Sequence, residues 1–63
     1  MKTFYCVTTV FTTEGACLSS ISVERAAVKP SGTYDDYGDR EVYNDFFESL
    51  AVAKAFQSGL ERG

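Results

Sequence analysis

Six of the nine acidic residues in this chain of 63 residues fall in one short segment, and Arg40 is the only base among them. Carboxylates gathered in this way can hydrolyse a bond by acid and base catalysis, coordinate a hard cation, or attract a basic partner. Three tyrosines lie beside them. The acidic residues are Asp35, Asp36, Asp39, Glu41, Asp45 and Glu48, and the tyrosines are Tyr34, Tyr37 and Tyr43.

Hydrolysis by two carboxyl groups requires a cleft whose surroundings separate their pKa values. A loop on a domain this small provides no such cleft. The chain has no histidine, which excludes Ser-His-Asp and Cys-His arrangements. We therefore expect no catalytic residue, no cofactor and no enzyme activity.

Metal binding is also disfavoured by the spacing of the acidic residues. A calcium loop that started at Asp35 would need a ligand at position three and glycine at position six. Those positions hold Tyr37 and Arg40, so the pattern fails. Zinc requires sets of cysteine or histidine that this chain lacks, and we expect no metal site.

The two cysteines are expected to be free thiols. If Thr13-Glu14-Gly15 closes a hairpin, Cys6 lies opposite Ser22 and Cys17 lies opposite Phe11. The two sulfurs would then be about 17 Å apart along the strands, whereas a disulfide requires Cα atoms within about 7 Å. A cysteine inside a strand acts as a small hydrophobic side chain.

Length and composition indicate one small domain that spans residues 1–63. A chain of this size buries only about 60% of its unfolded surface, so its core is small. Many Tyr, Phe, Val and Thr residues favour strands. No apolar run reaches the ~18 residues that a membrane span needs, and no signal peptide is evident, so we expect a cytoplasmic protein of a bacterial host cell.

The first half of the chain reads as a β-hairpin with strands Lys2–Thr12 and Ala16–Arg25, in which Gly15 takes a positive φ. The hairpin has two unlike faces. We expect the face with Tyr5, Val7, Thr9 and Phe11 to form the core. The opposite face, with Phe4, Cys6, Thr8 and Val10, is expected to be the wetter one.

The second half predicts a loop over Ser31–Asp39, a strand over Arg40–Phe47, and a helix over Leu50–Ser58. Alternation leaves open which face of the strand is buried. Ser49 is a good N-cap, Asp45 and Glu48 place negative charge before the helix, and Gly59 suits a left-handed C-cap. The apolar stripe of the helix is formed by Leu50, Ala53, Phe56 and Leu60.

These elements predict an α+β fold of order βββα. A three-stranded antiparallel sheet would carry one C-terminal helix packed on one face, which is the simplest layered arrangement. The other face of the sheet would meet solvent, a second copy or a target.

Both ends of the chain carry a resemblance to known proteins. The opening residues Met1–Phe11 (MKTFYCVTTVF) and the segment Phe46–Phe56 (FFESLAVAKAF) resemble small uncharacterised bacterial and phage proteins of hairpin, strand and helix. As a compact acidic domain without an enzyme motif, the chain is similar in type to phage anti-CRISPR proteins. The resemblance implies an inhibitor that covers a basic, nucleic-acid-binding surface of a bacterial defence complex.

The residues themselves favour a binding role for the acidic segment. Carboxylates can imitate a phosphate backbone, and tyrosines add contact area at low entropic cost. We expect a protein partner with a basic surface, such as a CRISPR effector subunit, and no direct contact with nucleic acid or membrane. The expected binding residues are Tyr34, Asp35, Asp36, Tyr37, Asp39 and Glu41.

Two alternatives remain open. The acidic segment is equally typical of a solvated face that only aids solubility. The chain could instead be a structural or assembly module, a homodimer rather than a monomer, that pairs through Phe4, Val10 and Leu18 on the uncovered sheet face.

Overall fold

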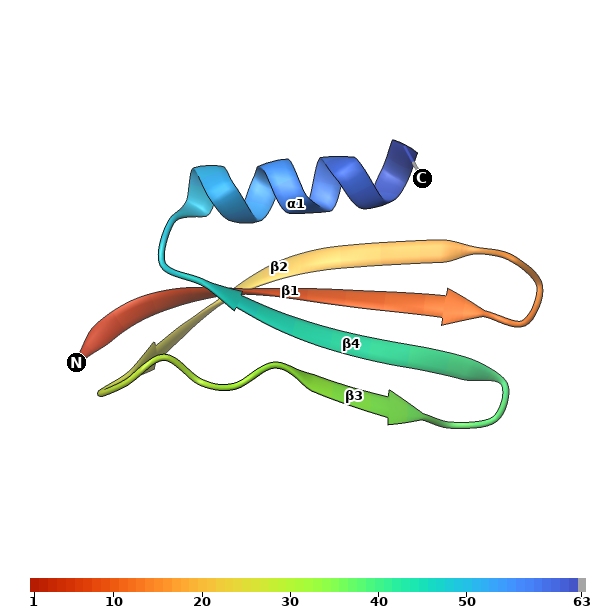
Figure 1. Cartoon of the computed structure of the whole chain (residues 1–63), viewed down its shortest axis with the longest axis horizontal. Coiled ribbons are helices and arrows are strands. Elements are labelled where there is room, and N and C mark those ends of the chain that lie inside the picture. The colour runs from red at the N-terminus through yellow and green to blue at the C-terminus, as the bar shows by residue number, and fades with distance from the viewer. Residues whose placement is uncertain (63) are drawn as a thin grey trace.

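A computed structural model describes the backbone of residues 1–62 and the side chains of residues 1–59. Four strands precede one helix (Figure 1). They are β1 (Lys2–Thr12), β2 (Cys17–Ala26), β3 (Thr33–Asp36), β4 (Arg40–Phe47) and α1 (Leu50–Arg62). The class is α+β with an antiparallel sheet and one C-terminal helix, as the sequence predicts.

The sheet has four strands, in the order β2-β1-β4-β3, so the prediction of three strands was wrong. The additional strand, β3, lies inside the segment Ser31–Asp39 that was expected to be a loop. All neighbouring pairs are antiparallel. Strands β1 and β4 are therefore central, and β2 and β3 form the two edges.

The hairpin of β1 and β2 follows the predicted register. Cys6 pairs with Ser22 and Phe11 with Cys17, and both cysteines are free, Cys6 buried and Cys17 exposed. Gly15 has φ 89°, a left-handed conformation that glycine adopts without steric cost. The inference from register to free thiols is thus confirmed.

Strand β3 forms because Gly38 closes a second tight hairpin with φ 87°. A row of polar side chains then fastens this edge strand to the sheet. The Thr8 hydroxyl donates to Asn44 Oδ1 at 2.7 Å, and Asn44 Nδ2 donates to Thr33 Oγ1 at 3.0 Å. One asparagine thereby links β1, β4 and β3.

Helix α1 begins as predicted. The Ser49 hydroxyl accepts from the Val52 amide at 3.4 Å, and its carbonyl accepts from the Ala53 amide at 3.0 Å. The helix continues past Ser58 to Arg62, so the prediction of a C-cap at Gly59 was wrong. Gly59 is helical and has no positive φ. The predicted stripe residue Leu60 has its side chain outside the described residues.

The helix covers one side of the sheet, here called the helix face. Val7 and Ala53 are fully buried between the two layers, and the rings of Phe47 and Phe56 lie 5.1 Å apart. Alternation then places Tyr43 and Asp45 on this face as well. Residues 42–47 of β4 are all half-buried, so both faces of this strand pack against other parts of the fold. Val7 and Thr9 are confirmed as core residues, whereas Phe11, which was predicted for the same core face, is exposed.

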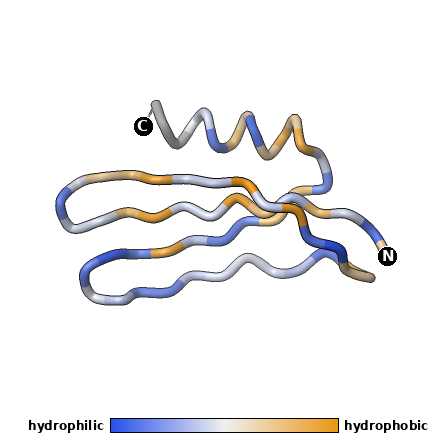
Figure 2. The backbone as a smooth tube through the Cα atoms, turned by 180° about the vertical axis from the view of Figure 1, so that it is seen from behind, coloured by the Kyte–Doolittle hydropathy of each residue, from blue (hydrophilic) through white to orange (hydrophobic). Residues whose placement is uncertain are grey.

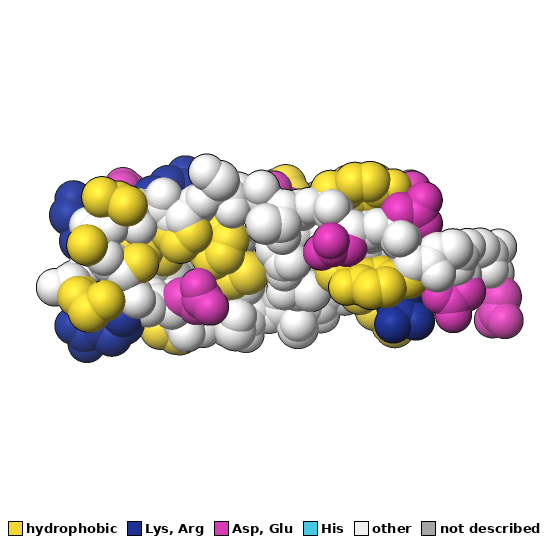
Figure 3. Space-filling view, turned by 90° about the horizontal axis from the view of Figure 1, so that it is seen from below, with side chains coloured by type: hydrophobic (Ala, Val, Ile, Leu, Met, Phe, Trp, Pro, Cys, Tyr) yellow, Lys and Arg dark blue, Asp and Glu magenta, His cyan; other side chains and the backbone are white. Residues whose placement is uncertain are grey.

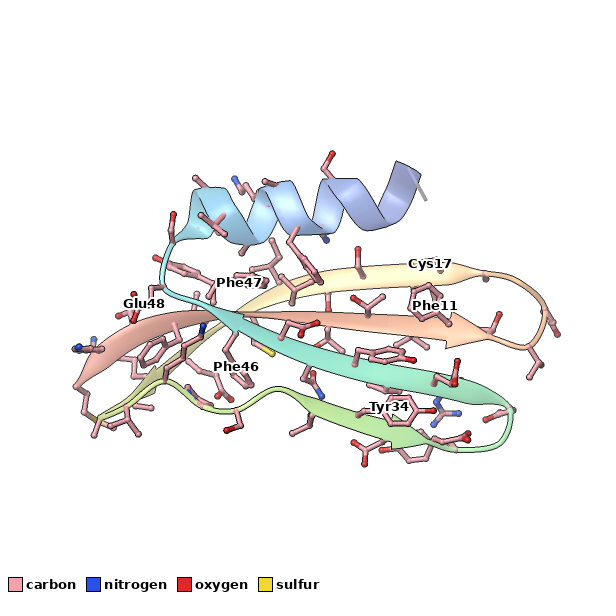
Figure 4. All side chains as sticks on the ribbon, in the orientation of Figure 1. Phe11, Cys17, Tyr34, Phe46, Phe47 and Glu48 are labelled. Atoms are coloured by element: carbon pink, nitrogen blue, oxygen red, sulfur yellow. The ribbon has the colours of Figure 1, made fainter. Side chains whose placement is uncertain are left out.

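The opposite side of the sheet, here called the far face, is buried from solvent at one end. Phe4 is only 1% exposed and Cys6 only 6%, so the expectation for these two residues was wrong. The connection between the two edge strands, residues 27–32, runs past this end of β1 and β4 (Figure 1). Within it Pro30 is half-buried. Figure 4 shows Phe46 pointing away from α1, toward that connection.

In the part of the chain that the structure describes, no helix is long and apolar enough to cross a membrane.

Candidate protein-binding surface

The two hairpin turns lie side by side at one end of the molecule. The amide of Thr13 donates to the carbonyl oxygen of Asp39 at 3.2 Å, because the pairing of β1 with β4 ends there at Thr12 and Arg40. Both turns are hydrophilic (Figure 2). The carboxylates of the two turns and of the adjoining ends of β3 and β4 form what we call the acidic end: Glu14, Asp35, Asp36, Asp39 and Glu41.

Glu14 belongs to this surface although the acidic segment of the sequence does not include it. The pairing of β1 with β4 brings the turn at Glu14 next to the turn at Asp39. The hairpin register alone could not reveal this, because it says nothing about which strand lies on the other side of β1. Glu14 could have been assigned to this surface by predicting that β4 pairs with the free side of β1.

The predicted binding residues divide between the two faces of the sheet. Tyr34, Asp36 and Glu41 lie on the helix face, where Asp36 pairs with Glu41. The Tyr34 hydroxyl donates to Glu41 Oε1 at 2.8 Å. Asp35 pairs with Val42 and lies on the far face. The six residues therefore cannot all touch one flat surface.

The turn itself gathers the other two predicted residues around Arg40. The guanidinium lies 4.8 Å from the centre of the Tyr37 ring and 3.3 Å from the Asp39 carboxylate. Asp36 Oδ1 accepts from the amide of Gly38 at 2.9 Å, which holds the turn. Tyr37 remains 57% exposed. Arg40 thus partly offsets Asp39 and holds Tyr37 against the turn.

Aromatic rings continue from the acidic end along the helix face. The rings of Tyr34 and Tyr43 are 4.8 Å apart, and those of Tyr43 and Phe11 are 5.7 Å apart in an edge-to-face arrangement. Tyr43 is half-buried, consistent with the packing expected of a strand tyrosine. Sequence reasoning missed Phe11, which is 36% exposed and lines a hollow of about 260 Å³ with Asp36 and Glu41.

Charge is segregated along the long axis of the molecule, which measures 39 × 23 × 13 Å. Viewed from the β3 side, most acidic side chains lie at one end and most basic ones at the other (Figure 3). The register places Lys2 and Arg25 at the end remote from the turns. The protein therefore presents a negative end and a positive end to a charged partner.

The remaining two acidic residues of the segment lie elsewhere. Glu48 follows β4 at the end of the molecule remote from the turns (Figure 4). Asp45 lies on the helix face beside Phe56. Among the described residues, no three His, Cys, Asp or Glu side chains come together in an arrangement that could hold a metal ion.

The contact between Tyr34 and Glu41 gives a prediction for pH dependence. The hydrogen bond to the Glu41 carboxylate, aided by desolvation, raises the pKa of Tyr34 from 10.0 to about 12. A raised pKa in the folded state means that this contact stabilises the fold fully below pH ~10 and is lost as pH rises through about 12. We expect the ultraviolet absorbance of tyrosinate to show a late transition, near pH 12, that belongs to Tyr34.

Two variants identify that tyrosine. Tyr34→Phe should remove the late transition, and Glu41→Gln should move it back toward the ordinary range. A late transition that persists unchanged in both variants would contradict the assignment.

Comparison of the chain with protein-family models, with curated proteins and with solved structures finds no significant match.

Proposed function

We propose that this protein is a small, non-enzymatic binding protein that docks its acidic end on a basic, nucleic-acid-binding surface of another protein. We propose that it is an anti-CRISPR protein, and that its partner is a subunit of a CRISPR effector complex. The protein would act by occupying the groove that the nucleic acid needs.

The observation that carries the proposal is the acidic end. In the part of the chain that the structure describes, two hairpins meet at one end and bring five carboxylates together, with Arg40 as the guanidinium among them. Such a concentration of one charge steers a basic partner into contact and holds wrong partners away. It also repels itself, so its presence costs stability. A merely solubilising surface would serve equally well with its charges dispersed.

Exposed aromatic area beside the charge supports the same function. Tyr34 is 51% exposed and Tyr37 is 57% exposed. Both rings are held in place, Tyr34 by Tyr43 and Glu41, and Tyr37 by Arg40. A tyrosine that is already ordered loses little entropy when it enters an interface. The surface thus combines long-range attraction with contacts that can provide affinity.

The alternative proposal of an assembly module has weaker support. Of its three residues, Phe4 is buried, and only Leu18, 62% exposed, is a large exposed apolar group. Val10 and Val42 continue its row across the far face, but both are half-buried. Of the three residues, only Leu18 therefore offers a large exposed apolar side chain to a second copy.

The test compares wild type with the double variant Asp36→Asn and Asp39→Asn. Binding to purified CRISPR effector complexes is measured as salt is raised from about 0.05 M to about 0.5 M. We expect the double variant to bind about tenfold more weakly at low salt and to lose less affinity as salt rises. Asparagine keeps the oxygen that accepts from Gly38, so the turn is preserved.

The matched control is Glu24→Gln with Glu48→Gln, which removes two exposed carboxylates that lie outside the acidic end. This variant should bind as wild type does. An effector already loaded with its nucleic acid should not bind the protein. If the two double variants lose affinity equally, or if loaded and empty effectors bind alike, docking through the acidic end is wrong.

A further inference from the structure

The two edges of the sheet are protected from further strand pairing to very different extents. Edge strand β3 has four residues and carries Asp35 and Asp36, and shortness and charge both discourage another strand. Edge strand β2 has ten residues (Figure 1). It contains no proline or lysine, and its register with β1 is unbroken, so no bulge bends it. Its charged residues, Glu24 and Arg25, lie near one end, which leaves residues 17–23 uncharged.

Alternate residues of β2 direct their backbone groups away from the sheet. The amide of Thr12 donates to the carbonyl oxygen of Ala16 at 2.9 Å, and hydrogen-bonded pairs recur at every second residue of an antiparallel ladder. The even-numbered residues of β2 therefore bond to β1. Within the described residues, no strand lies on the other side of β2. The residues whose amides and carbonyl oxygens point to that open side are Cys17, Ser19, Ile21, Val23 and Arg25.

Side chains beside this open edge are apolar on the helix face. Val23 is 64% exposed although it lies on the face that α1 covers, and the neighbouring Ile21 on that face is half-buried. Both are β-branched residues, which pack well against similar side chains on an adjacent strand. An added strand would therefore bond to the free backbone groups and cover Val23 at the same time.

A second copy of β2 is a strand that fits this edge. Two copies related by a twofold axis pair in the antiparallel direction, and each residue serves both copies. An axis at Ser22 places Ile21 of each copy opposite Val23 of the other, whereas an axis at Ser20 or Ile21 places Val23 opposite Cys17 or Ser19. The axis at Ser22 also keeps residues 18–26 paired along their whole length. About eight backbone hydrogen bonds would form between the two copies.

The charge of the whole molecule favours the same antiparallel arrangement. The strands run along the long axis, with the acidic end at the turns and with Lys2 and Arg25 at the remote end (Figure 1). Antiparallel pairing sets the acidic end of each copy beside the positive end of the other, whereas parallel pairing would bring like charges together. Asp35, Asp36 and Glu41 lie on β3 and β4, on the other side of the sheet from the β2 edge, so they remain accessible.

We propose that the open edge of β2 is an interface at which two copies of this chain join their four-stranded sheets into one continuous antiparallel sheet, with Ser22 at the twofold axis. The assembly closes at two copies because its outer edges are then the short, acidic β3 strands. This interface uses a different surface from the far-face pairing through Phe4, Val10 and Leu18. It does not depend on the proposed function.

Sedimentation equilibrium of the whole chain tests the association over about a hundredfold range of concentration. We expect the mass to rise from near 6.9 kDa toward twice that value. Val23→Lys should weaken the association about tenfold or more, since it brings two ammonium groups close together across the interface. The control is Val28→Lys, because Val28 is 75% exposed and lies outside β2. A wild type that stays monomeric, or equal association of the two variants, would overturn the proposal.

Two opposite changes at Ser20 test the position of the axis. With the axis at Ser22, Ser20 of one copy lies opposite Glu24 of the other, and both residues are exposed in one chain. Ser20→Lys should strengthen the association about fivefold through two pairs of opposite charge, and Ser20→Glu should weaken it by a similar factor. If both variants associate alike, the axis at Ser22 is wrong.

Hydrogen exchange of single amides, followed by NMR, tests whether the backbone of this edge takes part. At a concentration where wild type is dimeric, the amides of Ser19 and Ile21 should exchange about tenfold or more slowly than in Val23→Lys. The amides of Ser20 and Ser22 should be protected in both proteins, because they bond to β1. A dimer in which Ser19 and Ile21 exchange as fast as in Val23→Lys would associate through another surface, and the proposal would be wrong.

Discussion

Phe4→Ala is expected to remove most of the protein's free energy of unfolding at ambient temperature. Phe4 is only 1% exposed, and truncation of a buried phenylalanine costs about 3–5 kcal/mol. The total stability of a folded domain is about 5–15 kcal/mol, and a chain this short lies at the lower end. One substitution can therefore remove nearly all of it. Urea unfolding followed by circular dichroism measures the effect.

The control for this prediction is Phe11→Ala on the same strand. Phe11 is 36% exposed, so it leaves a smaller cavity, and we expect a loss of about 1 kcal/mol. If Phe4→Ala shifted the urea midpoint no further than Phe11→Ala, the far face would not contain a second part of the core.

Ala53→Leu is expected to destabilise the protein by about 2 kcal/mol through overpacking. Ala53 is fully buried between α1 and the sheet, so a larger side chain must push the helix outward. That movement would also separate Phe56 from Phe47, whose rings are 5.1 Å apart. For a domain of this size the unfolding midpoint should fall by about 8–16 °C.

The control for this second prediction is Ala55→Leu on the same helix. Ala55 is exposed, and alanine and leucine are both strong helix formers. We expect a change within about 0.5 kcal/mol. A similar fall in midpoint for both variants would mean that the helix does not lie close to the sheet at Ala53.

Local signals in the sequence were sufficient for the hairpin of β1 and β2 and for the start of α1. Gly15 and the alternation of residues determine that hairpin, and Ser49 determines the helix start. They failed for β3, because Asp35 and Asp36 are typical of loops and an edge strand exposed to solvent tolerates such residues. The strand is held by the contact of Thr33 with Asn44, which no pattern in the sequence reveals.

The candidate site, too, could be predicted only in part from local signals in the sequence. The acidic segment was visible as charge, but its division between two faces depends on the register of β3 with β4. Glu14 and Phe11 join the site only through the pairing of β1 with β4. The burial of Phe4 depends on long-range packing at the end of the far face. Helix α1 passes through Gly59, since glycine disfavours a helix by only about 1 kcal/mol.

The strand order also has a consequence for how quickly the chain can fold. Each of the two hairpins pairs residues close in sequence, and isolated hairpins form in about 1–10 μs. Within the sheet they are joined by the pairing of β1 with β4, in which Tyr5 meets Phe47 across most of the chain. That step must close a long loop before any contact compensates for the lost entropy. The meeting of two preformed hairpins is therefore the slow event, and it is also the event that assembles the acidic end.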